Sequence, residues 1–495
     1  MNKTVNLFQK ITGKSFFKCI IVGFGILSLI VPIVLSFFNT IDVDSAVILT
    51  EMERIAEGYV PYKTLHLNYP PLFFYINVAL KWIFQVPFGC YPFYLGVHYA
   101  FVFVSAWMIY LISREFKASK PISFLAVWLF IMITHWTQGN IVLFELPSIC
   151  FGLIAMYAAI HYSEKNCGHF LWIGAVAACS LLVKQFGLGF CLLVICLIVL
   201  YSKDRRLSRI GLFILGYLTP LALCLVIWGK DIVNSIILNG YGTNTAELAG
   251  WDVSFGHKCG QIIGNLWYFL RRVCPIVIYS TLLIPSALGN IKKGGDEWKQ
   301  MLICYLGILG FALQFWFVAG GLHYLLYLIP FAVLLLPSIY LLSNGRITKS
   351  LAILSIAITM LLGIYSTYHN RVYKGIISRG KESQCQISSI LSEKIEVGKK
   401  VWIPHGGIEY LYYFNNLMVP NIATIGYATG PLEVTLEKQW AQIKSADYVI
   451  CFKRVYPYEY SFNQEVRDWL SQFSVEPLDR DGEILLYDMD SKQQN

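Results

Sequence analysis

The chain has 495 residues, of which 56% are hydrophobic and only 14% are charged. Average soluble domains carry about 25% charged residues, so this composition and the mean hydropathy of +0.56 exclude an ordinary soluble enzyme. The net charge of +9 is spread over short loops and forms no basic patch with aromatic residues, which argues against a nucleic-acid partner. The sequence therefore predicts a polytopic α-helical membrane protein.

Apolar segments that are long enough to cross a bilayer, or nearly so, recur along most of the chain. Their number predicts roughly eleven spans. They lie at residues 17–38, 92–112, 121–136, 146–162, 170–183, 187–200, 210–228, 273–289, 301–319, 322–342 and 348–366.

The loops between these segments alternate in charge. Lys and Arg gather in every second loop, at residues 3–18, 114–120, 203–209, 292–299 and 346–349. Because basic loops stay on the cytoplasmic side, we expect a plasma-membrane protein with a cytoplasmic N-terminus. The loops at 39–91 and 229–272 and the tail after residue 367 then lie outside.

The first outer loop, residues 39–91, contains two short predicted helices. The stretch 45–57 has Ile48, Met52 and Ile55 on one face and is only about 20 Å long, so we expect it to lie in the membrane surface. The second helix, 72–84, follows Pro70-Pro71, is apolar all round and is too short to span comfortably. The loop is therefore predicted to form an interfacial shelf.

The tail at 367–495 is polar enough to form a small soluble domain. Alternating patterns predict strands at 401–407, 447–453 and 483–489 and helices at 408–416 and 463–473. The chain thus divides into a membrane domain, residues 1–366, and an extracytoplasmic α/β domain, residues 367–495.

The first-loop segments DSAVIL, EGYVPYKT and NYPPLFFY and the later segment HYLLYLIP, residues 323–330, form a recognisable set. Together they resemble GT-C fold glycosyltransferases that use polyprenyl-phosphate sugars, in particular the bacterial family of protein O-mannosyltransferases and lipid A aminoarabinose transferases. The resemblance implies an inverting transfer from a polyprenyl-phosphate-linked sugar to a hydroxyl of a lipid, glycan or protein acceptor. It implies no certain cofactor, and a divalent metal remains an open possibility.

The resemblance makes Asp44, which opens the first predicted helix, the catalytic base. The alternative is a helix N-cap, a role that Asp fills well. Many family members have Asp-Glu here, whereas this chain has Asp44-Ser45. Many also have Lys before Pro-Pro-Leu as a phosphate contact, whereas this chain has Tyr69, so another cation must substitute or the contact is absent.

Four further residues complete the predicted substrate site. Glu145 starts a span, where the helix dipole favours a carboxylate, or it binds acceptor or metal. Lys184 lies at an outer break between two short spans, where it either snorkels or contacts phosphate. The resemblance favours His323 as a donor-phosphate contact over a structural histidine. His66 belongs to the same set, and Asp42 is a solvated loop charge or, with Glu145, a metal ligand.

Two other functions fit a chain with many spans and large outer loops. An O-antigen-type polymerase or ligase typically depends on arginines in outer loops, whereas the distinctive loop here begins with acidic residues. A flippase or transporter of lipid-linked sugars requires ionisable groups deep within spans, and apart from Lys184 these are nearly absent.

Overall fold

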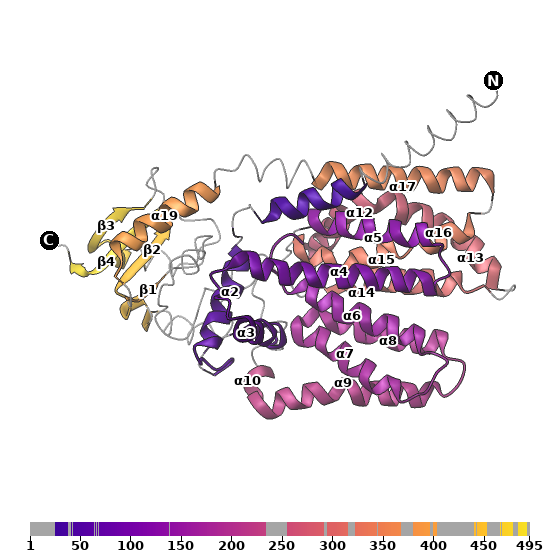
Figure 1. The fold of residues 1–495 in the computed structure, drawn as a ribbon, viewed down its shortest axis with the longest axis horizontal. Coiled ribbons are helices and arrows are strands. Elements are labelled where there is room, and N and C mark those ends of the chain that lie inside the picture. The colour runs from indigo at the N-terminus through magenta and orange to yellow at the C-terminus, as the bar shows by residue number, and fades with distance from the viewer. Residues whose placement is uncertain are drawn as a thin grey trace, which may run out of the picture.

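The computed structural model describes residues 25–37, 41, 43–63, 65, 67, 69–137, 139–233, 255–291, 295–314, 322–343, 345–367, 380–396, 399–402, 440–441, 443–452, 466, 468–478 and 484–492. These residues form a bundle of apolar helices and a small β-sheet. The sheet lies beyond one end of the bundle, next to the first-loop helices (Figure 1).

Most helices follow the predicted apolar segments, but the helix Phe255–Leu282 begins well inside the stretch 229–272 that was expected to be an outer loop, because polar residues such as Lys258 and Arg271 lower the hydropathy of its first half. In chain order the helices are Gly25–Ser36, α2 (Val43–Ala56), α3 (Leu72–Phe84), α4 (Tyr91–Glu115), α5 (Lys120–Trp136), α6 (Glu145–His161), α7 (His169–Val183), η1 (Gln185–Gly187), α8 (Leu188–Tyr201), α9 (Arg206–Trp228), α10 (Lys230–Val233), α12 (Phe255–Leu282), α13 (Ile284–Ile291), α14 (Glu297–Gln314), η4 (Leu322–Leu328), α15 (Ile329–Val333), α16 (Leu336–Leu342), α17 (Arg346–Thr367) and α19 (Gly380–Lys394).

Among the described residues, three helical segments are long and apolar enough to cross a membrane: Tyr91–Glu115, Arg206–Trp228 and His323–Leu342. A fourth span results if Val273–Leu282 and Ile284–Ile291, which meet at 43°, are counted together. The other apolar helices are shorter, with 10–17 residues. The expected count of roughly eleven spans therefore stays a prediction.

Helices α7 and α9 pack unusually closely. A Cβ at Gly174 of α7 would overlap the backbone carbonyl of Phe213, and one at Gly216 of α9 would overlap that of Leu171. Small residues of this kind let helix backbones touch, which compensates for the weak hydrophobic drive between helices in lipid. The contact fixes α7, and therefore the polypeptide that follows it, against the rest of the bundle.

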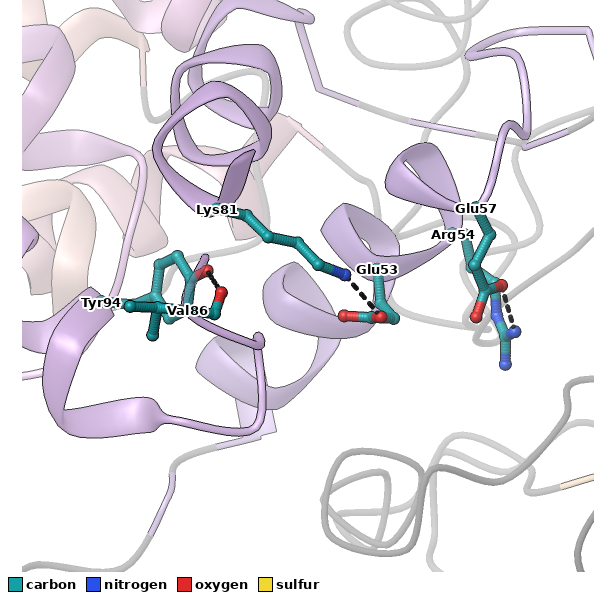
Figure 2. Close-up of polar contacts among 6 residues, drawn as sticks. All are labelled: Glu53, Arg54, Glu57, Lys81, Val86 and Tyr94. Carbon is teal, nitrogen blue, oxygen red and sulfur yellow. Dashed lines mark hydrogen bonds and ion pairs between the residues drawn. The ribbon is translucent and has the colours of Figure 1, made fainter. Parts of the chain in front are cut away.

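The first-loop helices α2 and α3 pack on each other at one end of the bundle (Figure 1). Figure 2 shows the ion pair that joins them, in which Lys81 Nζ lies 2.7 Å from Glu53 Oε1. At the end of α3, Trp82, Ile83 and Phe84 are exposed, which suits a helix that meets lipid.

Helix α2 differs from the surface helix that the sequence predicts. Its expected apolar face is buried, but so are Thr50, Glu51 and Arg54, polar residues that belong to the rest of the helix surface. Burial raises the pKa of Glu51 well above its ordinary value. The difference arises because other parts of the protein, including α3, cover α2 from more than one side, which hydropathy cannot reveal.

The tail contains a four-stranded sheet in the order β1-β2-β4-β3, where β1 is Val401–Trp402, β2 Tyr448–Phe452, β3 Phe473–Pro477 and β4 Ile484–Lys492. Strands β1 and β2 are parallel, and the other two pairings are antiparallel. The strands predicted at 447–453 and 483–489 are present, and the one predicted at 401–407 is present at Val401–Trp402, its remaining residues lying outside the described ones, whereas β3 and α19 were not predicted. Phe473 continues the helical spacing of Val466 and Leu470, so the sequence hides the start of β3. The helix expected at 408–416 lies outside the described residues.

We predict that Gly216→Ala lowers the thermal stability of the detergent-purified protein, because the new methyl group must displace the α7 backbone, an overpacking that costs about 1–3 kcal/mol. Gly211→Ala is the matched control on the same helix, since no heavy atom lies within 4 Å of its Cβ position. Gly211→Ala should be neutral or slightly stabilising, because alanine favours helix. Equal melting temperatures for the two variants would contradict the close contact.

Candidate functional site

Lys184 lies at a break between two helices. Helix α7 ends at Val183, and Lys184 has an extended backbone, with φ −151° and ψ 137°, before the short η1 and α8 begin. The turn back is possible because Gly187 approaches the Ser180 carbonyl so closely that any Cβ would overlap it. The break that the sequence predicts is therefore present, and it directs the Lys184 side chain into the bundle, where it is 4% exposed.

The Lys184 ammonium is paired with a buried carboxylate. Its Nζ lies 3.2 Å from Oε1 of Glu145, the first residue of α6, whose side chain is 1% exposed. The positive end of the α6 dipole also favours a negative charge at this position. Neither carboxylate oxygen accepts a hydrogen bond of good geometry from the described residues, so Glu145 retains acceptor capacity.

His323, in η4, lies between two carboxylates. Its Nδ1 is 4.0 Å from Asp44 Oδ2, and its Nε2 is 3.9 Å from Glu145 Oε1. Both separations are longer than a hydrogen bond. The Asp44 side chain is 42% exposed, against 17% for His323 and 1% for Glu145. Side-chain exposure therefore decreases across the site, from the accessible carboxylate of Asp44 to the buried ion pair of Glu145 and Lys184.

Aromatic rings surround the ammonium of Lys184. Its Nζ lies 4.1 Å from the ring centroid of Tyr69, 5.2 Å from that of Tyr324 and 5.4 Å from that of Phe144. Rings at these distances attract a cation and partly replace its lost hydration. The positive charge is therefore held over Tyr69, the residue that replaces the lysine expected in this motif.

A pair of serines joins α6 to α7 close to these charges. Ser148 Oγ donates to the Ser180 carbonyl at 2.9 Å, and Ser180 Oγ donates to the Ser148 carbonyl at 2.7 Å. Ser148 lies three residues after Glu145, and Ser180 lies four residues before Lys184. The reciprocal bonds therefore fix the two helix ends that carry the ion pair.

The structure brings together five of the residues that the sequence singles out, namely Asp44, Tyr69, Glu145, Lys184 and His323. Asp44 lies in the first turn of α2, inside the helix rather than before it, because α2 begins two residues earlier than expected. Asp42 and His66 lie outside the described residues. Within the described chain no group of three His, Cys, Asp or Glu side chains could hold a metal ion.

The site also contains residues that the sequence analysis did not select. Ser148, Ser180 and Tyr324 lie within apolar segments, Phe144 lies just before one, and all four are buried or nearly so, so their polar or aromatic character alone gives no signal. Their position in the sequence is the signal that could have identified them. Each lies within four residues of a candidate charged or polar residue, which is one helical turn or less.

Comparison of the fold with solved structures gives a clear match. No family model and no curated protein sequence matches the chain. The structure, however, has the GT-C fold seen in ArnT, a lipid A aminoarabinose transferase. The resemblance read from the first-loop motifs is thus confirmed at the level of the fold.

Two crystal structures of ArnT from Cupriavidus metallidurans are similar over nearly the whole chain. The one bound to undecaprenyl phosphate has a TM-score of 0.58 and 12% sequence identity, and the apo structure has a TM-score of 0.55 and 10% identity. Each match covers 94% of this chain and 98% of the ArnT chain.

We predict that Lys184→Met destabilises the protein by about 3–5 kcal/mol, because it leaves the Glu145 charge buried without its partner. The double variant Lys184→Met/Glu145→Gln should recover part of this loss. Thermal unfolding of the purified variants measures both effects.

The control is Lys203→Met, which removes a lysine whose ion pair with Glu164 is exposed, with side chains 79% and 59% accessible. Such surface pairs contribute about 0–1 kcal/mol. If Lys184→Met were as stable as Lys203→Met, the buried pair would not have the importance that its geometry indicates.

Proposed function

We propose that this chain is an inverting glycosyltransferase that moves a sugar from a polyprenyl-phosphate donor to an acceptor hydroxyl at the outer membrane surface. The observation that carries the proposal is the convergence of Asp44, His323, Glu145 and Lys184 in a chain with the fold of ArnT. ArnT has been crystallised bound to undecaprenyl phosphate, which supports a lipid donor of that class here.

Asp44 is the proposed general base. Its side chain is 42% exposed, so an acceptor hydroxyl can reach it. As the hydroxyl oxygen attacks the anomeric carbon, its proton passes to the Asp44 carboxylate. The bond from the anomeric carbon to the phosphate oxygen breaks on the opposite face, and the oxygen leaves with the bonding electron pair. The configuration at the anomeric carbon is therefore inverted.

The departing phosphate gains negative charge, and this charge needs stabilisation. Lys184 and His323 are the proposed contacts, together supplying the positive charge that Tyr69 lacks. The Lys184 ammonium has three donors, and its pairing with Glu145 at 3.2 Å leaves N–H groups for phosphate oxygens. Glu145 then fixes the ammonium, while Tyr69 and the neighbouring rings keep water from it.

The proposed reaction requires a definite orientation. The N-terminus is cytoplasmic, and the tail at 367–495 is an extracytoplasmic domain on the same side as the first-loop helices. In support, the sheet lies at the α2–α3 end of the bundle and α13, which precedes a basic loop, lies at the other end (Figure 1). The acceptor, whether lipid, glycan or protein, would arrive from the outer side.

We predict that Asp44→Asn lowers turnover by about 10²-fold or more, because the amide keeps the shape of the side chain but cannot accept the proton. Release of free polyprenyl phosphate from a labelled lipid-phosphate sugar, with the acceptor present, measures the transfer and distinguishes it from transport. The same assay over a panel of sugars identifies the donor.

The control is Asp42→Asn, which removes a carboxylate two residues away and should cost much less. Near-normal transfer by purified Asp44→Asn from a competent donor would show that Asp44 only stabilises the start of α2. In that case the mechanism proposed here would be wrong.

We predict that a membrane-impermeant maleimide labels Asp490→Cys in intact cells and leaves Asp204→Cys unlabelled. Both positions are exposed, one on the tail and one in a basic loop. Peptide mass spectrometry distinguishes the new thiols from the native cysteines. Labelling of position 204 with protection of position 490 would show that the topology is inverted.

A further inference from the structure

The hydroxyl of Ser45 connects two segments that are far apart in the sequence. Ser45 Oγ donates to the carbonyl of Val142 at 3.2 Å and accepts from the N–H of Val142 at 3.1 Å. Ser45 is fully buried and Val142 is 1% exposed. Buried backbone groups must be paired, and a single side chain here pairs both groups of one residue.

The two connected segments each carry a charged residue of the candidate site. Ser45 directly follows Asp44 on α2, and Val142 lies three residues before Glu145, in the segment that leads into α6. His323 then faces both carboxylates, at 4.0 Å and 3.9 Å. The covalent chain joins Asp44 to Ser45 and Val142 to Glu145, and hydrogen bonds join Ser45 to Val142. The contacts of His323 with Asp44 and Glu145 therefore close a circuit of connected residues.

The segment before α6 has no regular structure of its own to hold it. Residues 141–144 lie between a turn and the first residue of α6, so their position depends on outside contacts. The ring of Phe144 packs on Tyr69, Phe73 and Phe74, which fixes its place laterally. Apolar packing of this kind is non-directional, whereas the two hydrogen bonds to Ser45 set a definite register.

We propose that Ser45 is a positioning residue that fixes Asp44 relative to Glu145 and His323. This inference rests on the proposed function, because the distance that it sets is the distance between the base and the groups around the phosphate. Displacing a catalytic group by about 1 Å can cost 10²-fold in rate. Loss of the hydroxyl should therefore act through Asp44, although Ser45 itself contacts no reacting atom.

The first test measures the hydrogen bonds without any activity. Ser45→Ala should speed amide exchange of the peptide containing Val142 by roughly 10-fold, the ratio that matches one hydrogen bond of typical net strength. Ser45→Cys keeps the volume but bonds weakly and should resemble Ser45→Ala, whereas Ser45→Thr keeps the hydroxyl and should restore slow exchange. Ser113→Ala is the control, since Ser113 is equally buried and its hydroxyl lacks a hydrogen-bond partner among the described residues. Unchanged exchange in Ser45→Ala would overturn the proposal.

The second test asks whether Ser45 acts through Asp44. Ser45→Ala should lower kcat by about 10-fold or more with little change in KM for the donor. In the Asp44→Asn background the same change should have almost no further effect, because the group being positioned is gone. If the losses in kcat caused by the two single changes multiply in the double variant, Ser45 has a general structural role and the proposal is overturned. If the wild-type protein transfers no sugar, the proposed function fails, whereas amide exchange still decides whether Ser45 holds the 141–144 segment.

Discussion

The ion pair between Lys184 and Glu145 is the interaction on which the arrangement of this site depends. Both side chains are almost completely buried, and removing two charges from water costs several kcal/mol per ion unless their surroundings compensate. Here the compensation comes from three sources. Glu145 lies at the start of α6, where the helix dipole is positive. Aromatic faces surround the ammonium. The serines that join α6 to α7 hold both ends of the pair in place.

The break between α7 and α8 also helps to bury this ion pair. A continuous helix through residues 169–201 would leave Lys184 on one helix surface, whereas the break lets it enter the bundle. Interrupted helices are tolerated at membrane depth only where neighbouring protein pairs the freed backbone groups. In this chain Lys184 N–H donates to the Ser180 carbonyl and Gly187 N–H donates to the Lys184 carbonyl. These bonds pair both backbone groups of Lys184 itself, so the break provides a fixed position for a cation.

Hydropathy located most helices of the bundle but missed the first half of α12 and the polar α19, and residue chemistry was enough to select the charged positions. Helix α3 has the bounds expected from its apolar run, and Lys184 lies at the predicted break. What the sequence could not reveal was which helix ends meet. His323 lies 279 positions from Asp44, and no local pattern reports that its ring faces both Asp44 and Glu145. The bond of Ser45 to Val142 spans 97 residues and is equally invisible, because an isolated serine has no periodic signal. In the tail, the parallel pairing of β1 with β2 has the same non-local origin.

The glycine contact between α7 and α9 also restricts lipid access. Where two helix backbones touch, no acyl or prenyl chain can pass between them, so that seam is closed along the level of Gly174 and Gly216. A long isoprenoid would have to enter along another groove of the bundle. Substitutions that open this seam would therefore do more than loosen the packing. They would open α7 to hydrocarbon on its α9 side, and α7 leads directly to Lys184, whose buried charge is far more costly in contact with lipid.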